Sequence, residues 1–235
     1  MLRALCDGRG VTFNRSVSIY EDSMKAFRSG DTGLAEEFAL ELLGESSDDD
    51  DVGGRVDGLC MLARIALRRG EFWRVSSLAD SAWGAALGAR SPREEMMLKR
   101  MPIHLLAVGA RMRGEYAEAR LLYRESINLN RELGENRMVA AEHRNLAYVE
   151  LHDGHLDRAR ELFASSVELA RAAKYDALEP FLLQDAAVLA LEDGDRDRAA
   201  ELLVDTQAAF ASAGQVPDPD DAAELEALQS RLEEL

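Results

Sequence analysis

The sequence predicts an all-α fold that consists of five helix-turn-helix pairs and a C-terminal helix. Three observations lead to this prediction: a segment pattern that repeats about every 40 residues, apolar residues spaced by three and four, and a composition with 6% aromatic residues and 5 prolines in 235 residues. Repeats of this length are typical of solenoids, and the apolar spacing is typical of amphipathic helices. The scarcity of aromatic residues argues against a β-sandwich.

Five segments have a glycine at their second position and a similar run of apolar residues after it. The glycines are Gly30, Gly70, Gly114, Gly154 and Gly194, at intervals of 40, 44, 40 and 40 residues. A glycine is expected between the helices of a pair because the first helix ends in a left-handed turn, which a residue without Cβ adopts at little cost. Each segment therefore predicts one helix, a tight turn and a second helix.

A small side chain follows most of these glycines by five positions. The residues are Ala35, Ala119, Ala159 and Ala199, with Val75 as the larger exception. A large side chain at this place would keep the two helices of a pair apart. We therefore expect these positions to be buried where the helices meet.

Turn and loop signals divide the chain into an N-terminal extension, five repeats and a C-terminal capping helix. The extension covers residues 1–12, the repeats cover 13–44, 54–88, 92–133, 136–173 and 176–213, and the cap covers 220–235. Pro217 and Pro219 separate the last repeat from the cap. The cap has a stripe of apolar residues, Leu225, Leu228, Leu232 and Leu235. We expect this stripe to cover the end of the stack while Glu224 faces water.

Charge and hydropathy restrict the compartment and the partners. The chain has 28 Lys and Arg against 44 Asp and Glu, a formal net charge of -16, and so acidic a surface repels a phosphate backbone. No apolar run approaches the roughly 20 residues of a membrane-spanning helix, and the first residues lack the apolar segment of a secretory signal. Cys6 and Cys60 cannot form a disulfide framework. We expect a cytoplasmic protein with no membrane contact and no direct contact with nucleic acid.

Motifs for catalysis or metal binding are absent from the sequence. It has no glycine-rich nucleotide loop, nucleophile elbow or metalloprotease helix, and neither cysteine has a second cysteine or histidine at metal-ligand spacing. His152, Asp153 and His155 fall at a turn between helices, where a polar surface is expected in any repeat. We therefore expect no enzymatic activity, no cofactor and no metal site.

The repeats resemble the tetratricopeptide repeat over about residues 13–213. The third and fourth copies match its pattern best, through Ile103, Leu106, Ala107, Gly114, Ala119 and Tyr123, and then Leu146, Ala147, Gly154, Ala159 and Phe163. The period of about 40 exceeds the usual 34 of the family. In this respect the chain is similar to the arrays of bacterial signal-responsive regulators. The resemblance implies a right-handed α-solenoid whose first helices form a concave groove.

The resemblance also implies which residues face that groove. The candidate partner-binding residues are Tyr20, Met24, Phe27, Arg64, Arg68, His104, Arg111, Arg144, Asn145 and Tyr148. The arginines concentrate positive charge in an acidic protein, and a guanidinium binds a carboxylate through a planar pair of donors. The aromatic and methionine side chains would receive apolar groups of the same partner. Asn145 falls at a position where the family often has an asparagine that binds the main chain of a ligand.

These features predict a non-catalytic scaffold or adaptor that binds an acidic segment of a protein or peptide. One alternative is a regulatory sensor of a small effector or signalling peptide, related to transcription or signalling, and another is an accessory subunit of an enzyme. A third alternative is that the groove arginines only form salt bridges with acidic residues of neighbouring helices. A further alternative is a homodimer that forms through the apolar residues of the first repeat, Phe13, Val17, Tyr20 and Phe27.

Overall fold

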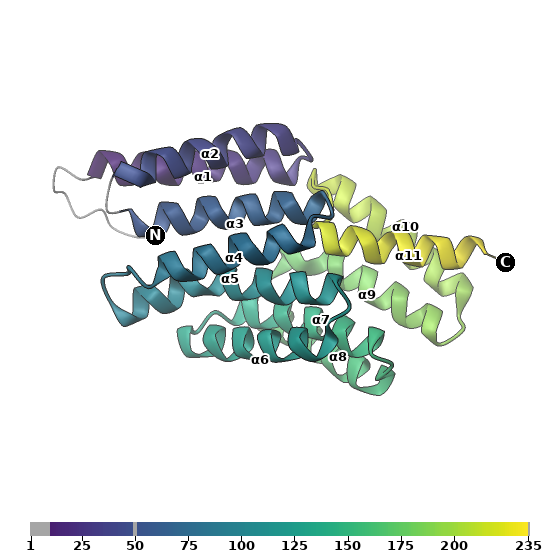
Figure 1. The fold of residues 1–235 in the computed structure, drawn as a ribbon. Coiled ribbons are helices and arrows are strands. Elements are labelled where there is room, and N and C mark those ends of the chain that lie inside the picture. The colour runs from purple at the N-terminus through teal and green to yellow at the C-terminus, as the bar shows by residue number, and fades with distance from the viewer. Residues whose placement is uncertain (1–9, 49–50, 235) are drawn as a thin grey trace. The chain divides into compact units, whose positions relative to one another are not determined.

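The computed structural model describes residues 10–48 and 51–234, in which there are eleven α-helices, one short 3-10 helix and no β-strand (Figure 1). This confirms the predicted all-α class. Most of the predicted extension, Cys6, the side chain of Phe13 and Leu235 lie outside the described residues. None of the described helices is long and apolar enough to cross a membrane.

Consecutive helices form antiparallel hairpins, as expected for a helical solenoid. The pairs are α1 (Gly10–Arg28) with α2 (Thr32–Asp48), α3 (Val52–Arg68) with α4 (Phe72–Ala86), α5 (Pro92–Met112) with α6 (Tyr116–Leu133), α7 (Asn136–His152) with α8 (Leu156–Ala172), and α9 (Glu179–Glu192) with α10 (Arg196–Ala213). The 3-10 helix η1 (Asp176–Leu178) precedes α9, and α11 (Pro219–Glu233) follows the last pair.

The turn glycines have the backbone conformation that the sequence predicts. Gly30, Gly70, Gly114, Gly154 and Gly194 have φ angles of 89°, 73°, 76°, 83° and 79°. The positions five residues later, Ala35, Val75, Ala119, Ala159 and Ala199, are all 0% exposed. The close approach of the two helices in each pair therefore depends on a glycine in the turn and a compact side chain behind it.

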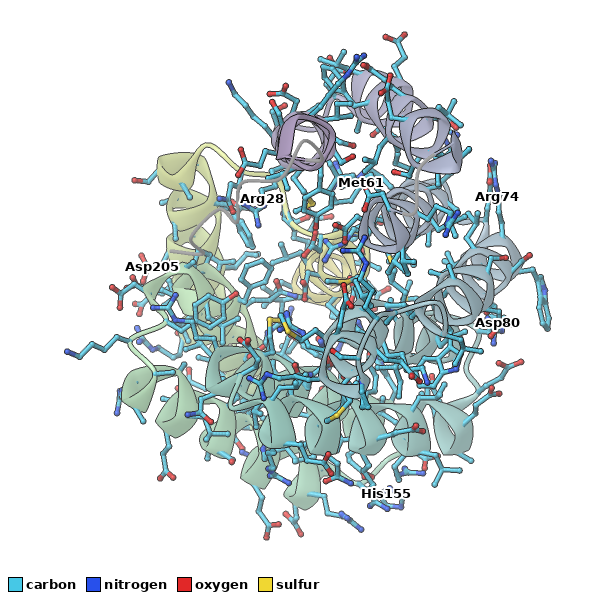
Figure 2. All side chains as sticks on the ribbon, turned by 90° about the vertical axis from the view of Figure 1, so that its left-hand side faces the viewer. Arg28, Met61, Arg74, Asp80, His155 and Asp205 are labelled. Carbon is cyan, nitrogen blue, oxygen red and sulfur yellow. The ribbon has the colours of Figure 1, made fainter. Side chains whose placement is uncertain are left out.

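The chain divides into two compact units, with the boundary between Leu105 and Leu106 inside α5. In the first unit, Phe27 of α1 and Met61 of α3 pack in a common core. Figure 2 shows Arg74 and Asp80 on the outside of α4, away from this core.

In the second unit, Tyr148 of α7, Phe163 of α8 and Leu228 of α11 share one core. Leu232 of α11 packs against the same cluster. Two of the four leucines of the predicted apolar stripe therefore bind α11 to the second unit. This contact places the acidic first turn of α11 among the first helices of the neighbouring pairs.

Candidate partner-binding site

The first turn of α11 holds the acidic side of a buried polar cluster in the second unit. Asp220 and Asp221 belong to this turn, and α11 packs against α9 and α10 (Figure 1). Both aspartates are buried. Burying a carboxylate costs free energy unless a charged or hydrogen-bonding group binds it, so the partners of these two residues define the site.

Arg111, in the last turn of α5, binds two carboxylates of α11. Its guanidinium binds the carboxylate of Asp220, and its Nη1 donates to Oε1 of Glu224 at 2.9 Å. The same Glu224 oxygen lies 2.8 Å from Nε2 of His152 at the end of α7. The expectation that Glu224 faces water is therefore wrong, because α11 turns this residue toward α5 and α7.

Arg144, in the middle of α7, connects α9 with α11. Its Nε lies 2.8 Å from Oδ1 of Asp185, and its Nη1 lies 2.5 Å from Oδ1 of Asp221. The hydroxyl of Tyr148 donates to the same Asp185 oxygen at 2.9 Å. Gln184 donates to the main-chain carbonyl of Asp221 at 3.1 Å. One guanidinium therefore fixes the positions of three helices.

We call Arg111, Arg144, Asp185, Asp220, Asp221 and Glu224 the groove cluster. It contains four carboxyl groups for two guanidinium groups. Burial raises the pKa of Asp185 to about 6 and that of Asp221 to about 7, although Arg144 acts in the opposite direction on both. Burial also raises the pKa of the Tyr148 hydroxyl well above its ordinary value, so this group stays protonated and donates.

This arrangement corrects the prediction that four of the candidate residues are exposed to a ligand. They are Arg111, Arg144, Asn145 and Tyr148. These four residues are between 0% and 6% exposed. The guanidinium groups are bound by carboxylates of the same chain, and Asn145 donates to Oε2 of Glu142 at 3.4 Å. The alternative that the groove arginines form salt bridges within the chain is therefore confirmed for Arg111 and Arg144.

The other predicted residues belong to the first unit. Tyr20, Met24 and Phe27 come from α1, Arg64 and Arg68 from α3, and His104 from α5. The guanidinium of Arg68 lies 4.0 Å from the centroid of the Phe27 ring, and Nη2 of Arg64 lies 3.3 Å from Sδ of Met101. Phe27 is 1% exposed, so its predicted place on a ligand surface is wrong and it is a core residue. The other five are half-buried.

Asp57 is an acidic residue of the first unit that was not among the predicted site residues. Burial raises its pKa to about 7, with a further contribution from the negative charge of Asp51. Burial also raises the pKa of the nearby Tyr20, on which the charges of Arg64 and Asp57 act in opposite directions. The sequence signal was an aspartate among the inward-facing positions of an otherwise apolar and basic helix.

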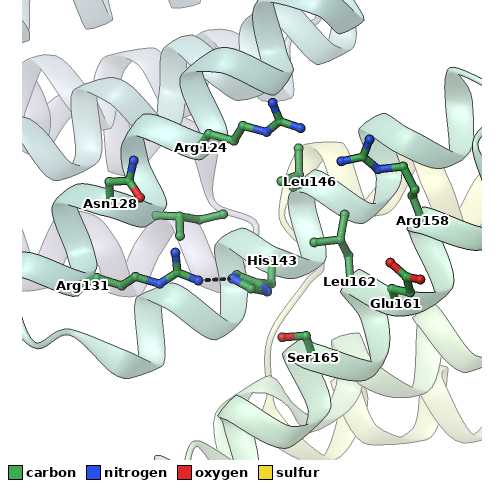
Figure 3. Close-up of a pocket in the computed structure, with 10 residues that line it drawn as sticks. Arg124, Asn128, Arg131, His143, Leu146, Arg158, Glu161, Leu162 and Ser165 are labelled. Carbon is green, nitrogen blue, oxygen red and sulfur yellow. Dashed lines mark hydrogen bonds between the residues drawn. The ribbon is translucent and has the colours of Figure 1, made fainter.

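A pocket of about 400 Å³ between α6, α7 and α8 was also missed. Its floor is apolar, with Ile127, Leu146 and Leu162. Its rim carries three arginines, Arg124, Arg131 and Arg158, together with Glu161 and His143. Figure 3 shows Arg124 and Arg158 around Leu146, and Arg131 at hydrogen-bond distance from His143, 3.1 Å between Nη2 and Nε2.

We call this feature the arginine pocket. It was missed because the resemblance to the tetratricopeptide repeat directs attention to first helices, whereas α6 and α8 are second helices. The signal available in the sequence was the spacing of Arg124 and Arg131, seven residues apart and therefore on one face of a helix. Ile127 lies between them at spacings of three and four, which predicts an apolar side chain on the same face.

No profile of a known protein family and no curated protein matches the chain. Solved structures do match. The apo form of RapI has a TM-score of 0.61 at 13% identity, over 93% of this chain and 77% of that chain. BtubC (BKLC) from P. vanneervenii has a TM-score of 0.57 at 21% identity, over 87% of this chain and 82% of that chain. At these identities the similarity shows a common helical fold.

Proposed function

We propose that this chain is a non-catalytic binding protein with repeats of the tetratricopeptide type, which recognises an acidic segment of a protein or peptide in the groove of its second unit. The groove cluster is the observation that carries this proposal. There, α11 already presents three acidic side chains to Arg111 and Arg144. A partner segment that takes the place of α11 would meet the same two guanidinium groups.

The contacts of α11 describe the partner that would fit. Its carboxylates at positions 220, 221 and 224 bind the arginines, and Leu228 and Leu232 pack on the core one and two turns further along. A suitable partner is therefore an amphipathic helix with acidic residues in its first turn and leucines after it. Buried charge pairs of this kind select a partner by charge and orientation, while the apolar residues supply most of the affinity.

The position of α11 favours a regulatory form of this function. A partner enters the groove cluster only when α11 leaves it, so that binding and the release of α11 are one event. Because α11 is covalently attached, its effective concentration at the groove is on the order of millimolar. A weak partner would therefore be excluded, and a strong one would release a helix that can act as a signal.

The remaining parts of the proposal concern the partner and the compartment. The net charge of -16 favours a protein partner over nucleic acid, and we propose a cytoplasmic location. Self-association through α1 stays a prediction. Phe27 cannot contribute to it because its ring lies in the core, whereas Val17 is exposed.

A peptide that copies residues 216–234 tests the proposal in trans. The recipient is the full chain with Asp220→Asn, Asp221→Asn and Glu224→Gln, which keeps the size of these side chains and weakens the docking of its own α11. We expect the peptide to bind this variant at least about tenfold more tightly than the wild type, measured by fluorescence anisotropy. A peptide with the same three substitutions is the matched control and should bind neither protein.

Equal binding of the acidic and the neutral peptide would contradict the proposed acidic specificity. Far-ultraviolet circular dichroism establishes that the triple variant keeps its helices. The single variant Glu224→Gln, which retains both aspartates, is the milder recipient if the triple variant unfolds. With this variant as recipient, the acidic peptide should again bind more tightly than it binds the wild type, and more tightly than the neutral peptide does. The differences in affinity should be smaller than with the triple variant.

A further inference from the structure

We infer that the arginine pocket is a second binding site, for an acidic peptide segment of a partner protein that inserts one large apolar side chain. The pocket has a volume of about 400 Å³, which lies within the range of about 300–1,000 Å³ common for ligand sites. Ile127 and Leu146 of its floor are 4% and 5% exposed. An apolar group that fills the pocket would therefore lie against side chains whose positions are already fixed by packing within the protein.

The rim of the pocket supplies the charge. Arg124, Arg131 and Arg158 stand against a single acidic rim residue, Glu161, in a chain with a net charge of -16. Arg124 has no carboxylate partner among the residues that the structure describes, and Nε of Arg158 is 3.9 Å from the nearest one, on Glu150. These guanidinium groups keep most of their capacity to bind an external carboxylate.

Two other arginines at the surface of this unit, one half-buried and one exposed, each have a close carboxylate partner. Arg160 binds Asp193 at 2.6 Å, and Arg231 binds Glu192 at 2.6 Å. In the first pair the carboxylate comes from the adjacent repeat, and in the second pair an arginine of α11 binds a carboxylate of α9. The arginines of the pocket lie on the same kind of surface without such a close carboxylate, so a partner that brings carboxylates gains the ion pairs that this surface lacks.

The exposed rim favours a peptide over a small molecule. Arg124, Arg131 and Arg158 are all exposed, so a small anion on the rim would keep much of its surface in water. A peptide segment covers the rim with its own main chain and places acidic residues on both sides of the apolar one. Shielding of this kind strengthens contacts at the centre of an interface.

The pocket is separate from the groove cluster. On α7, His143 and Leu146 line the pocket with α6 and α8, whereas the Arg144 guanidinium binds carboxylates of α9 and α11 and the Tyr148 hydroxyl donates to Asp185 of α9. The two sites therefore occupy different faces of one helix. A partner in the arginine pocket leaves α11 in place, so this inference does not rest on the proposed function of the groove.

The probe is a phage-displayed library of random dodecapeptides, selected on the full chain and counter-selected on the variant Arg124→Glu, Arg158→Glu. The expected peptides share one large apolar residue flanked by Asp or Glu. Either single charge reversal should weaken a selected peptide by about tenfold or more, because an attractive contact becomes a repulsive one. Replacing the apolar residue of the peptide by alanine should cause a similar loss.

Arg171→Glu is the matched control, since Arg171 is an exposed arginine of α8 outside the pocket. Its affinity for the selected peptides should stay within about twofold of the wild type. The inference is overturned if no peptide depends on the pocket, if the selected peptides lack acidic residues, or if Arg171→Glu weakens binding as much as Arg124→Glu. Displacement of the peptides by inorganic phosphate alone would overturn it as well, in favour of a phosphate site.

Discussion

Two sets of arginines in the second unit have the same side chain and differ in what surrounds it. Arg111 and Arg144 of the groove cluster are 3% and 2% exposed and bind carboxylates of the same chain. Arg124 and Arg158 of the arginine pocket are exposed above an apolar floor. A buried pair combines a large desolvation cost with a strong attraction, whereas an exposed pair has little of either.

This difference separates two uses of positive charge in an acidic protein. In the groove cluster the guanidinium groups bind α11 to α5 and α7, and we expect folding to depend on these contacts. In the arginine pocket we expect the charge to contribute little to folding and to stay available to the inferred partner. Variants that remove one arginine at a time from the two sets measure whether this separation holds.

The largest effect is expected for Arg144→Ala. This change leaves Asp185 and Asp221 buried without their guanidinium, and breaking a buried pair in this way costs about 3–5 kcal/mol. Urea unfolding at pH 8, followed by circular dichroism, measures the loss. The matched control Arg124→Ala should change the free energy of unfolding by less than about 0.5 kcal/mol. Equal losses in the two variants would remove the distinction between the sets.

A second effect concerns pH. The pKa values of Asp185 and Asp221 are raised from 3.8 to about 6 and about 7, so between about pH 4 and pH 7 the folded state binds more protons than the unfolded state. The stabilisation from this proton binding is fully present below the unfolded pKa and is lost as the pH rises through the folded pKa values. The contribution of the groove cluster to stability should therefore fall from pH 4 to pH 7.

Asp221→Asn isolates this contribution because asparagine does not titrate. Urea midpoints between pH 4 and pH 8 should show a shallower pH dependence in the variant than in the wild type. Glu150 is not expected to interfere, since hydrogen bonding from Arg120 lowers its pKa below 4.5 and its stabilisation is lost only at more acidic pH. An unchanged slope in Asp221→Asn would mean that this carboxyl does not carry the effect.

Much of the fold follows from local signals in the sequence. A turn glycine such as Gly154 and a small residue such as Ala159 each satisfy a requirement within one hairpin, so that a repeat pattern is enough to place both. The φ angle of 83° at Gly154 and the complete burial of Ala159 confirm this. Three residues predicted on the first helices of the second unit, Arg111, Arg144 and Tyr148, lie together, and all three are buried.

The site could not be derived in the same way because its partners lie far apart in the chain. Asp220 and Arg111 are separated by 109 residues, and Asp221 and Arg144 by 77. Periodicity shows which face of a helix is polar without showing which other helix covers it. The positions of Asp220, Asp221 and Glu224 on one side of the last helix were the available signal for docking on the basic groove, because acidic residues so spaced share a face.

A smaller effect is expected for Tyr148→Phe, which removes one hydrogen bond from the groove cluster and keeps both arginines. Asp185 loses the hydroxyl donor at 2.9 Å, and a buried hydrogen bond of this kind contributes about 1 kcal/mol. The pKa of Asp185 should rise further, since this hydrogen bond lowers it in the wild type. Urea unfolding against Tyr175→Phe, a half-buried tyrosine outside the cluster, measures the difference.

The smallest effect is expected for Arg158→Ala in the arginine pocket. Among the described residues, Arg158 has one carboxylate at ion-pair distance, that of Glu150 at 3.9 Å, and the arginine side chain is 59% exposed. Such a pair contributes about 0–1 kcal/mol at low ionic strength and is screened by salt, since the Debye length falls to about 3 Å at 1 M. Urea midpoints of the variant and the wild type should therefore differ slightly at low salt and coincide at high salt. A loss that persists at high salt would show that Arg158 contributes to packing, and the separation between an arginine set for folding and one for binding would then fail at this residue.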